Sequence, residues 1–317
     1  RLENKNVLVT GGAGFIGSHL VDRLLENQNH VTIVDNFDPF YSGKEKNIEK
    51  NLGNPNFEFA KGDVLNYDLL RKILEKKDVV FHLAAQAGIR FSTENPLKTH
   101  MVNSTGTLNV LQAVKECGVR KIVFASSSSV YGIAKRLPIE EGYPTLPVSI
   151  YGSSKLSAEN YCRCYNKLFR MNVVALRYFT VYGPRQRPDM AIYKFVKAIL
   201  DGEPPMIFGD GEQTRDFTYV DDAVQGTILA AEREIEGFEV FNLGGGSRIS
   251  VNKLVLMILN MLGKKEGIEP KYLDARREEV HDTFADITKA REKLGYAPKV
   301  DFKRGLENFI EWFAKNR

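Results

Sequence analysis

The chain has 317 residues, of which 43% are hydrophobic and 26% are charged, and this composition excludes a disordered or fibrous protein. Its length is sufficient for one large domain or two ordinary ones. The formal net charge is +4, but lysine and arginine are mixed with a nearly equal number of acidic residues, so nucleic-acid binding is not expected.

The sequence shows neither an apolar run of about 18 residues nor a signal peptide, so we expect a cytoplasmic protein with no membrane partner. The three cysteines form no disulfide or zinc framework, and the five histidines lack the short spacings of metal ligands. We therefore expect reduced thiols and no metal.

Short β-branched segments alternate with segments of helical periodicity along the first 130 residues, and the alternation continues beyond them. The predicted strands are residues 7–10, 31–34, 57–59, 79–83, 121–124, 173–176 and 240–243. The predicted helices are residues 15–26, 96–117, 151–169, 192–201, 251–262 and 305–315. This order predicts an α/β fold, a doubly wound parallel sheet with helices on both faces.

A glycine-rich turn follows the first predicted strand and opens the first helix, with Gly11, Gly14 and Gly17 as its glycines. Glycine permits positive φ angles, a close approach of the backbone to a pyrophosphate, and tight packing of helix on strand. The free N–H groups at the helix N-terminus then bind the phosphates. The strand, turn and helix context predicts a dinucleotide site.

Acidic residues end the second and third predicted strands. Asp35 stands 18 residues after Gly17 and would accept hydrogen bonds from the adenosine ribose while repelling a 2′-phosphate. Asn36 and Phe37 follow it rather than an arginine, so we expect NAD and not NADP. Asp63 is placed to contact the adenine, although an ordinary turn aspartate is an alternative.

A tyrosine and a lysine, Tyr151 and Lys155, lie four residues apart at the start of a predicted helix and therefore share a face. A free tyrosine is only about 0.1% phenolate at neutral pH, and both Lys155 and an oxidised nicotinamide would favour the phenolate. Alone, such a pair is usually a surface feature. Its position after a dinucleotide-binding sheet favours a base, and the hydroxyls of residues 126–129 emerge at the same edge of that sheet.

These motifs, from Gly11 to Trp312, resemble the extended short-chain dehydrogenase/reductase superfamily, and specifically its NAD-dependent nucleotide-sugar epimerases and dehydratases. The resemblance implies that Tyr151 is the catalytic base, Lys155 its partner and Ser127 the catalytic serine. It implies further cofactor contacts from Phe15, Ile16, Asn36, Val64, Leu83, Ala84, Ala85, Asn103 and Tyr178. In the implied reaction, Tyr151 takes a proton from a sugar hydroxyl and hydride moves from the same carbon to NAD. The keto-sugar then rotates and takes the hydride back on its other face.

Within this group, the residues after the serine strand indicate the reaction type. Sugar 4,6-dehydratases carry Asp-Glu where this chain has Ser128 and Ser129, and UDP-glucuronate decarboxylases carry Glu at the position of Ser129. Both lyase activities are therefore less favoured than 4-epimerisation. UDP-galactose 4-epimerases commonly have Asn where Thr180 stands, whereas Thr180 followed by two arginines is similar to UDP-glucuronate 4-epimerases.

A uronate substrate needs hydroxyl and cationic donors around its carboxylate. Such donors would also restrain the carboxylate of a 4-keto uronate, a β-keto acid that readily loses CO₂. The expected substrate-binding residues are Gln86, Ser127, Ser128, Tyr151, Thr180, Arg185 and Arg187, with Arg215 and Arg276 on the diphosphate. The alternatives left open are that Arg185 and Arg187 are loop charges or bind phosphate, and that Arg215 and Arg276 are surface residues.

We therefore expect a Rossmann domain of residues 1–178 with later strands from about 217–245, and a nucleotide-sugar lobe of residues 179–216 and 246–317. The helices at residues 96–117 and 151–169 could form a homodimer interface, as in relatives. The expected reaction converts UDP-glucuronate to UDP-galacturonate. Alternatives are 4-epimerisation of UDP-glucose or a UDP-N-acetylhexosamine, UDP-glucuronate decarboxylation, or a non-catalytic NAD-binding scaffold.

Overall fold

The computed structural model describes residues 1–264, 266–276 and 280–317. Its centre is a parallel sheet of seven strands in the order β11-β6-β5-β4-β1-β2-β3. In chain order these are β1 (Asn6–Thr10), β2 (His30–Asp35), β3 (Phe57–Lys61), β4 (Val79–His82), β5 (Lys121–Ser127), β6 (Asn172–Tyr178) and β11 (Phe238–Leu243). The predicted doubly wound α/β fold is confirmed.

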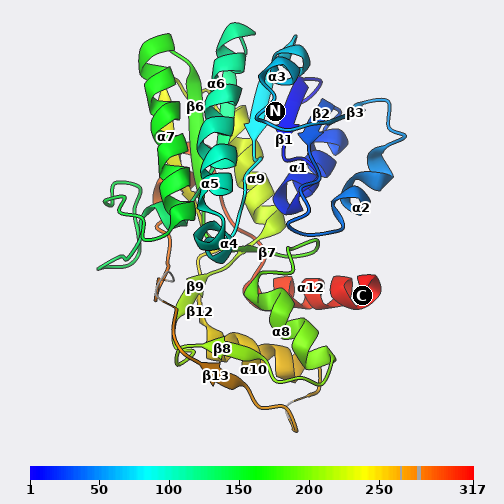
Figure 1. Cartoon of the computed structure of the whole chain (residues 1–317), viewed down its shortest axis with the longest axis vertical. Coiled ribbons are helices and arrows are strands. Elements are labelled where there is room, and N and C mark those ends of the chain that lie inside the picture. The colour runs from blue at the N-terminus through cyan, green and yellow to red at the C-terminus, as the bar shows by residue number, and fades with distance from the viewer. Residues whose placement is uncertain (265, 277–279) are drawn as a thin grey trace.

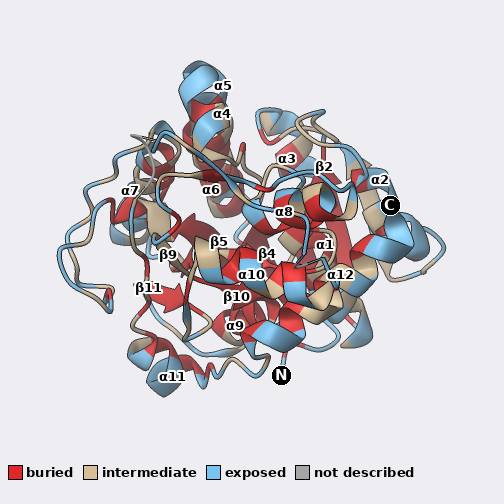
Figure 2. Cartoon of the chain, turned by 90° about the horizontal axis from the view of Figure 1, so that it is seen from below, coloured by how far each residue is buried: buried red, intermediate tan, exposed pale blue. Residues whose placement is uncertain are grey.

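Helices cover both faces of this sheet because its strands are apolar on both sides (Figure 1). Along β1, Val7 and Val9 contribute to one core and Leu8 to the other. The first core includes α1 (Phe15–Glu26), α9 (Val220–Glu232) and α11 (Thr288–Leu294). The second includes α3 (Tyr67–Leu74), α6 (Gly106–Glu116) and α7 (Ile150–Phe169). Figure 2 shows buried residues concentrated in the strands and exposed residues on the outer sides of the helices.

The helix expected over residues 96–117 is present but interrupted. It consists of α5 (Pro96–His100), a π-helical segment (Met101–Thr105) and α6, and a short α4 (Ile89–Glu94) precedes it. Proline begins α5, where its missing N–H removes no helical hydrogen bond. The helix α9 lies where the sequence indicated only later strands, so that expectation was incomplete.

A smaller group of elements lies beyond the carboxyl ends of the strands (Figure 1). Its helices are α8 (Ala191–Leu200), α10 (Val251–Met261) and α12 (Phe302–Asn316). Its paired strands are β7 (Val181–Tyr182) with β10 (Thr218–Tyr219), β8 (Met206–Phe208) with β13 (Lys271–Leu273), and β9 (Thr214–Asp216) with β12 (Arg248–Ser250). Two short helical segments, α2 (Lys44–Ile48) and η1 (Glu49–Asn51), follow β2, and η3 (Ser128–Val130) follows β5.

The order of strands reverses direction at β1, whose neighbours are β4 and β2. Ligands of open α/β sheets bind beyond the carboxyl ends of the strands at such a point. The loops after β1, β2, β4 and β5 therefore meet at one edge, facing the smaller group of elements. Among the described residues, no helix combines the length and apolar character that a membrane span requires.

Candidate active site

Two adjoining pockets lie at this edge, and Tyr151 lines both of them. The first pocket receives most of the expected cofactor residues and three expected substrate residues, Gln86, Tyr151 and Arg187. The expected cofactor residues in it are Gly11, Gly14, Phe15, Ile16, Gly17, Asp35, Asn36, Asp63, Val64, Leu83, Ala84, Ala85, Tyr151, Lys155 and Tyr178. The second receives Ser127, Ser128, Tyr151, Thr180, Arg187 and Arg276. Phe15, Ile16, Tyr178 and Arg187 also line both. The expected cofactor and substrate residues therefore converge around one phenol.

The glycine turn leaves no room for side chains. A Cβ atom on Gly17 would lie 2.1 Å from the carbonyl oxygen of Gly11. Gly11 has a φ of +69°, and a Cβ there would lie 2.8 Å from the backbone of Ala84 at the end of β4. Gly14, the N-cap of α1, offers no side chain to cap the helix. Residues 14–17 line the first pocket, so the N-terminus of α1 borders it, where a helix favours an anion.

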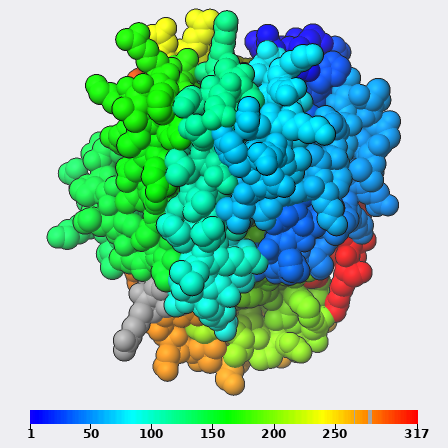
Figure 3. Space-filling model, turned by 45° about the horizontal axis from the view of Figure 1, so that its top comes forward, coloured from blue at the N-terminus to red at the C-terminus, as the bar shows by residue number. Residues whose placement is uncertain are grey.

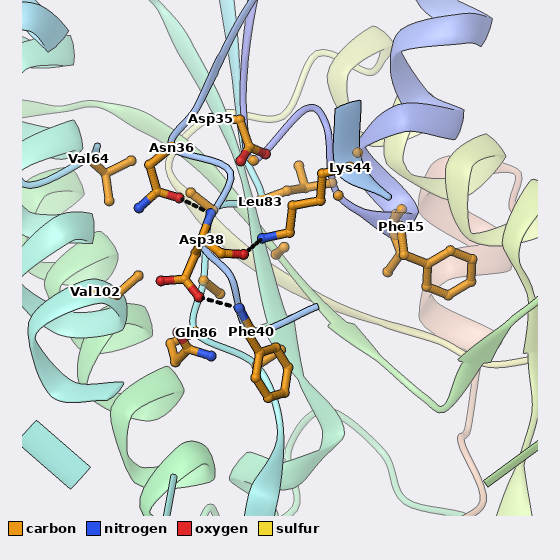
Figure 4. Close-up of a pocket in the computed structure, with 18 of the residues that line it drawn as sticks. Phe15, Asp35, Asn36, Asp38, Phe40, Lys44, Val64, Leu83, Gln86 and Val102 are labelled. Atoms are coloured by element: carbon orange, nitrogen blue, oxygen red, sulfur yellow. Dashed lines mark hydrogen bonds between the residues drawn. The ribbon is translucent and has the colours of Figure 1, made fainter. Parts of the chain in front are cut away.

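Asp35 ends β2 with its carboxylate inside the first pocket (Figure 4). It accepts hydrogen bonds from the backbone N–H of Ala13 at 3.1 Å and of Phe37 at 2.9 Å. Burial is the largest influence on this carboxylate and raises the pKa of Asp35. Asn36 beside it donates to the carboxylate of Asp63 at 2.7 Å, so the segments that follow β2 and β3 are joined at this point.

The segment between β2 and α2 supplies pocket residues that the sequence reasoning missed. Figure 4 shows Asp38, Phe40 and Lys44 projecting toward the first pocket, where the Lys44 ammonium donates to the carbonyl of Asp38 at 2.9 Å. The hydroxyl of Tyr41 accepts from the N–H of Phe15 at 3.2 Å, at the N-terminus of α1. The available signal was two adjacent aromatic residues in an irregular segment directly after Asp35.

Helix α7 begins at the site and presents Tyr151 and Lys155 to it. The Ser149 hydroxyl caps the helix by accepting from the N–H of Gly152 at 3.0 Å. The Lys155 ammonium is buried and donates to the carbonyl of Ala125 at 2.8 Å. Burial lowers the pKa of Lys155 to about 8.

The groups that act on the Tyr151 phenol come from β5 and from the loop after β7. Burial raises the pKa of Tyr151, while the charge of Arg187 and a hydrogen bond from the Ser127 hydroxyl lower it. Burial has the largest influence, so the net shift is upward. Arg187 is therefore a cation that favours the phenolate and to which the sequence analysis did not give this role, while the role expected of Lys155 stays a prediction.

A buried polar network lies behind these residues. Glu159, one turn beyond Lys155, forms an ion pair with Arg177 of β6, and their side chains are 2% and 4% exposed. The Ser126 hydroxyl of β5 donates to the Glu159 carboxylate at 2.8 Å, and the Arg177 guanidinium lies 4.7 Å from the centre of the Tyr131 ring. The network joins α7 to both strands that end at the second pocket.

Arg187 lines both pockets, and its guanidinium is held by contacts of its own. Its Nε and one Nη donate to the carboxylate of Asp189 at 2.8 and 3.0 Å, and its centre lies 5.8 Å from that of the Phe40 ring. The Arg276 guanidinium lies in the second pocket, 3.5 Å from the centre of the Phe208 ring. The structure thus brings two of the four expected arginines to the site.

Three expected site residues lie outside both pockets. Asn103 is buried and donates to the carbonyl of Gln86 at 3.0 Å, so it holds a pocket residue from behind. Arg185 turns away and forms an ion pair with Asp22 of α1 at 2.7 Å. Arg215 donates to the backbone carbonyls of Thr214 and His281, each at 2.9 Å. Both arginines make these contacts in the structure, and their expected contacts with the substrate stay predictions.

The comparisons with known proteins agree with this geometry. The model of the family described as GDP-mannose 4,6 dehydratase matches residues 8–309. A similar solved structure is the UDP-glucuronic acid 4-epimerase from Bacillus cereus in complex with UDP-glucuronic acid and NAD, which is 41% identical with a TM-score of 0.93 over 98% of this chain and 100% of that chain. Another is the UDP-glucose 4-epimerase from Thermotoga maritima with UDP-glucose, at 39% identity and a TM-score of 0.91 over 98% and 99%.

Among sequence relatives, the UDP-glucuronate 4-epimerase of Thermodesulfobacterium geofontis is 40% identical over 315 residues, which are 98% of this chain and 96% of that protein. The resemblance to the extended short-chain dehydrogenase/reductase epimerases and dehydratases is thereby confirmed. The chain belongs to the GDP-mannose 4,6 dehydratase family.

Proposed function

We propose that this protein is an NAD-dependent isomerase that converts UDP-glucuronate to UDP-galacturonate by inverting C4 of the sugar. The observation that carries the proposal is the position of Tyr151, which lines both pockets with the Arg187 guanidinium and the Ser127 hydroxyl acting on its phenol. A base between two binding sites can act on a substrate and face a cofactor at once. Solved relatives at about 40% identity that hold UDP-sugars and NAD support the assignment.

The residues of the first pocket fit NAD. The N-terminus of α1, whose N-cap Gly14 has no side chain, suits a diphosphate. Asp35 suits a ribose with two free hydroxyls, and the side chains of Val64, Leu83 and Val102 give apolar walls (Figure 4). Lys155 and Tyr178 line the same pocket near Tyr151, where the nicotinamide end would lie. When bound, NAD supplies an acceptor for the C4 hydride and returns it later in the same turnover.

Replacing Asp35 by asparagine is expected to lower the affinity for NAD about 10-fold to 100-fold, because hydrogen bonds to a charged acceptor contribute roughly 1.5–3 kcal/mol. Discrimination against NADP should fall as well, since the repulsion of a 2′-phosphate is lost. Titration calorimetry with both dinucleotides measures the two effects. Asp68→Asn, in α3 outside both pockets, should bind like the wild type. Unchanged NAD binding by Asp35→Asn would contradict this placement of the ribose.

The chemistry at the sugar falls to Tyr151 and Ser127. The Tyr151 phenolate removes the proton of the C4 hydroxyl and later returns it, so the same residue acts as base and acid. Ser127 accepts from the N–H of Ser129 at 3.1 Å, which holds its hydroxyl at the end of β5 while it hydrogen-bonds the phenol. The elimination of water would need a second acid and base, and the positions after Ser127 carry hydroxyls instead.

The second pocket contains the donors that a uronate carboxylate requires. Ser127, Ser128 and Thr180 offer hydroxyls, and Arg187 offers a guanidinium whose Nε and one Nη are already held by Asp189. The remaining Nη of Arg187 is left for a substrate carboxylate while that pair stays formed. Donors on several sides would keep the carboxylate from rotating perpendicular to the C4 carbonyl, and so would oppose loss of CO₂ from the 4-keto sugar.

Replacing Arg187 by alanine should lower kcat/KM for UDP-glucuronate about 10-fold to 100-fold, the value of one charged hydrogen bond to a carboxylate. Both sugars should lose the effect of the Arg187 charge on the Tyr151 phenol, but the loss for UDP-glucose should be smaller because that substrate lacks the carboxylate. Steady-state rates with both sugars give the comparison, and Arg187→Lys should recover part of the loss by restoring the charge. Equal losses for both sugars would show that Arg187 does not contact the carboxylate.

A neutral UDP-hexose is the second candidate substrate, favoured by the similarity to a UDP-glucose 4-epimerase. Offering UDP-glucuronate, UDP-glucose and UDP-N-acetylglucosamine separately, and comparing kcat/KM for each, decides between the candidates. A higher value for UDP-glucuronate supports the proposal. Turnover of the neutral sugars alone would reject the uronate assignment, and turnover of none would favour a scaffold.

We also propose that two copies associate through the outer surface of α5, α6 and α7. These helices lie side by side on the face that Figure 3 presents. Apolar side chains on them are exposed, with Leu97 79% and Leu168 70% accessible to solvent. Covering such side chains in a four-helix interface would be favourable, and sedimentation velocity on the purified protein would measure the mass of the assembly.

A further inference from the structure

Arg185 and Pro184 connect the loop after β7 to the first helix of the dinucleotide site. The Arg185 guanidinium forms an ion pair with Asp22 at 2.7 Å, and their side chains are 18% and 12% exposed. The ring Nε2 of His19 lies 2.9 Å from the Pro184 carbonyl oxygen. Burial, with a further contribution from Arg185, lowers the pKa of His19 to about 4, so the ring is neutral at pH 7. Since a carbonyl only accepts, Nε2 carries the proton and donates.

The anchoring side chains share one face of α1. Phe15, His19 and Asp22 are spaced four and three residues apart, and Phe15 lines both pockets. The His19 ring packs edge-on against that of Phe15, with 6.1 Å between their centres. The same face of α1 therefore borders the pockets at Phe15 and, two turns later, binds the loop after β7 at Asp22.

Asp22 is itself held in place. Its carboxylate accepts from the side-chain amide of Asn51 at 2.8 Å and pairs with the Lys50 ammonium at 2.9 Å. Lys50 belongs to η1 and its side chain is 60% exposed, so it pairs with the same carboxylate from a segment other than the loop after β7. Arg185 differs because its Nη1 is buried with no hydrogen-bond partner among the described residues. Without Asp22, this buried cation would lack its partner and would favour a rearranged loop.

The backbone of residues 185–187 couples the ion pair of Arg185 with Asp22 to the position of Arg187. Arg185 adopts a left-handed conformation with a φ of +62°, which is costly for a residue with a Cβ and persists only where contacts hold it. The next residue, Gln186, is buried and accepts from the N–H of Gly183 at 3.2 Å. Arg187 follows directly and lines both pockets. Only one residue separates the anchor from the guanidinium beside Tyr151.

We propose that Arg185, Asp22 and His19 form a tether that sets the position of Arg187 and thereby the preference for a carboxylated sugar. Arg185 and Asp22 are positioning residues: they act through Arg187 and lie away from the reacting atoms. The proposal rests on the proposed function, in which Arg187 binds the uronate carboxylate. It predicts that selectivity between two sugars depends on an ion pair outside both pockets.

The test compares Arg185→Ala, Asp22→Asn, Arg185→Lys and the control Lys50→Ala in the NAD-bound protein. Arg185→Ala and Asp22→Asn should raise KM for UDP-glucuronate and lower the ratio of kcat/KM for UDP-glucuronate to that for UDP-glucose about tenfold, with kcat changed less. Arg185→Lys should restore part of the ratio by renewing the ion pair. Lys50→Ala removes an ion pair from the same carboxylate but should leave the ratio unchanged.

Amide hydrogen exchange across residues 183–190 gives a readout that does not depend on turnover. The tether predicts faster exchange in Arg185→Ala and Asp22→Asn, and wild-type exchange in Lys50→Ala. Loss of both activities in equal proportion would show a general structural role and overturn the proposal, as would an unchanged ratio or unchanged exchange. If the wild type does not turn over UDP-glucuronate, the proposed function is rejected, and unchanged exchange would then reject the tether separately.

Discussion

Replacing Tyr151 by phenylalanine is expected to lower kcat by about 10²-fold to 10⁴-fold, the usual contribution of a positioned general base. The variant keeps the aromatic ring that lines both pockets and removes only the hydroxyl that exchanges the proton. Affinity for NAD and for the UDP-sugar should therefore change little. Single-turnover rates with NAD-bound protein measure the chemical step, and calorimetry measures binding.

Tyr165 offers a matched control on the same helix. Its hydroxyl donates to the side chain of Gln112 at 2.9 Å, and it lies outside both pockets. Tyr165→Phe should retain wild-type kcat. If Tyr151→Phe also retained it, another group would have to move the proton, and the assignment of the base would be wrong.

Replacing Glu159 by alanine is expected to lower the free energy of unfolding by about 3–5 kcal/mol, because it leaves the Arg177 guanidinium buried without its counter-ion. It also removes the acceptor of the Ser126 hydroxyl, which lies 2.8 Å from the Glu159 carboxylate. Activity should fall too, since the same network joins α7, with Tyr151 and Lys155, to β5 and β6. Chemical denaturation followed by circular dichroism measures the stability.

Two further variants separate the burial of charge from the loss of packing. Glu26→Ala removes an exposed pair with Arg23, whose side chains are 66% and 54% exposed, and should cost no more than about 1 kcal/mol. Glu159→Leu combined with Arg177→Met removes both charges and should be less destabilising than Glu159→Ala. A loss below about 1 kcal/mol in Glu159→Ala would show that Arg177 finds another partner.

The sheet could be predicted closely because its strands are buried on both faces and therefore appear as short apolar runs separated by helical periodicity. The glycine turn was predictable for a similar reason, since Gly11 and Gly17 stand where the backbone admits no side chain. The helix α9 was missed although its first turn carries Asp221 and Asp222, which favour a helix N-terminus. The pattern of its apolar residues does not distinguish this helix from the strands that precede and follow it in the sequence.

The substrate side of the site was less predictable. Arg185 and Arg187 stand two residues apart in an irregular loop, and no periodicity tells which of them faces a pocket. The directions of the two side chains are set by the positive φ at Arg185 and by the ion pairs of Arg185 with Asp22 and of Arg187 with Asp189. Which acid pairs with which arginine is known only from the structure. Lys155 illustrates the same limit: its spacing placed it on the face of Tyr151, while the Ala125 carbonyl determined its hydrogen bond.

The central claim, reversible oxidation at C4 of a uronate with Tyr151 as base, is tested most directly by proton NMR of UDP-glucuronate incubated with the NAD-bound protein in deuterated water. We expect UDP-galacturonate with protium retained at C4, because the hydride leaves and returns without exchanging with solvent, and with protium retained at C5, because no step removes the C5 proton. Deuterium at C4 or C5, or a UDP-pentose formed with loss of CO₂, would contradict it.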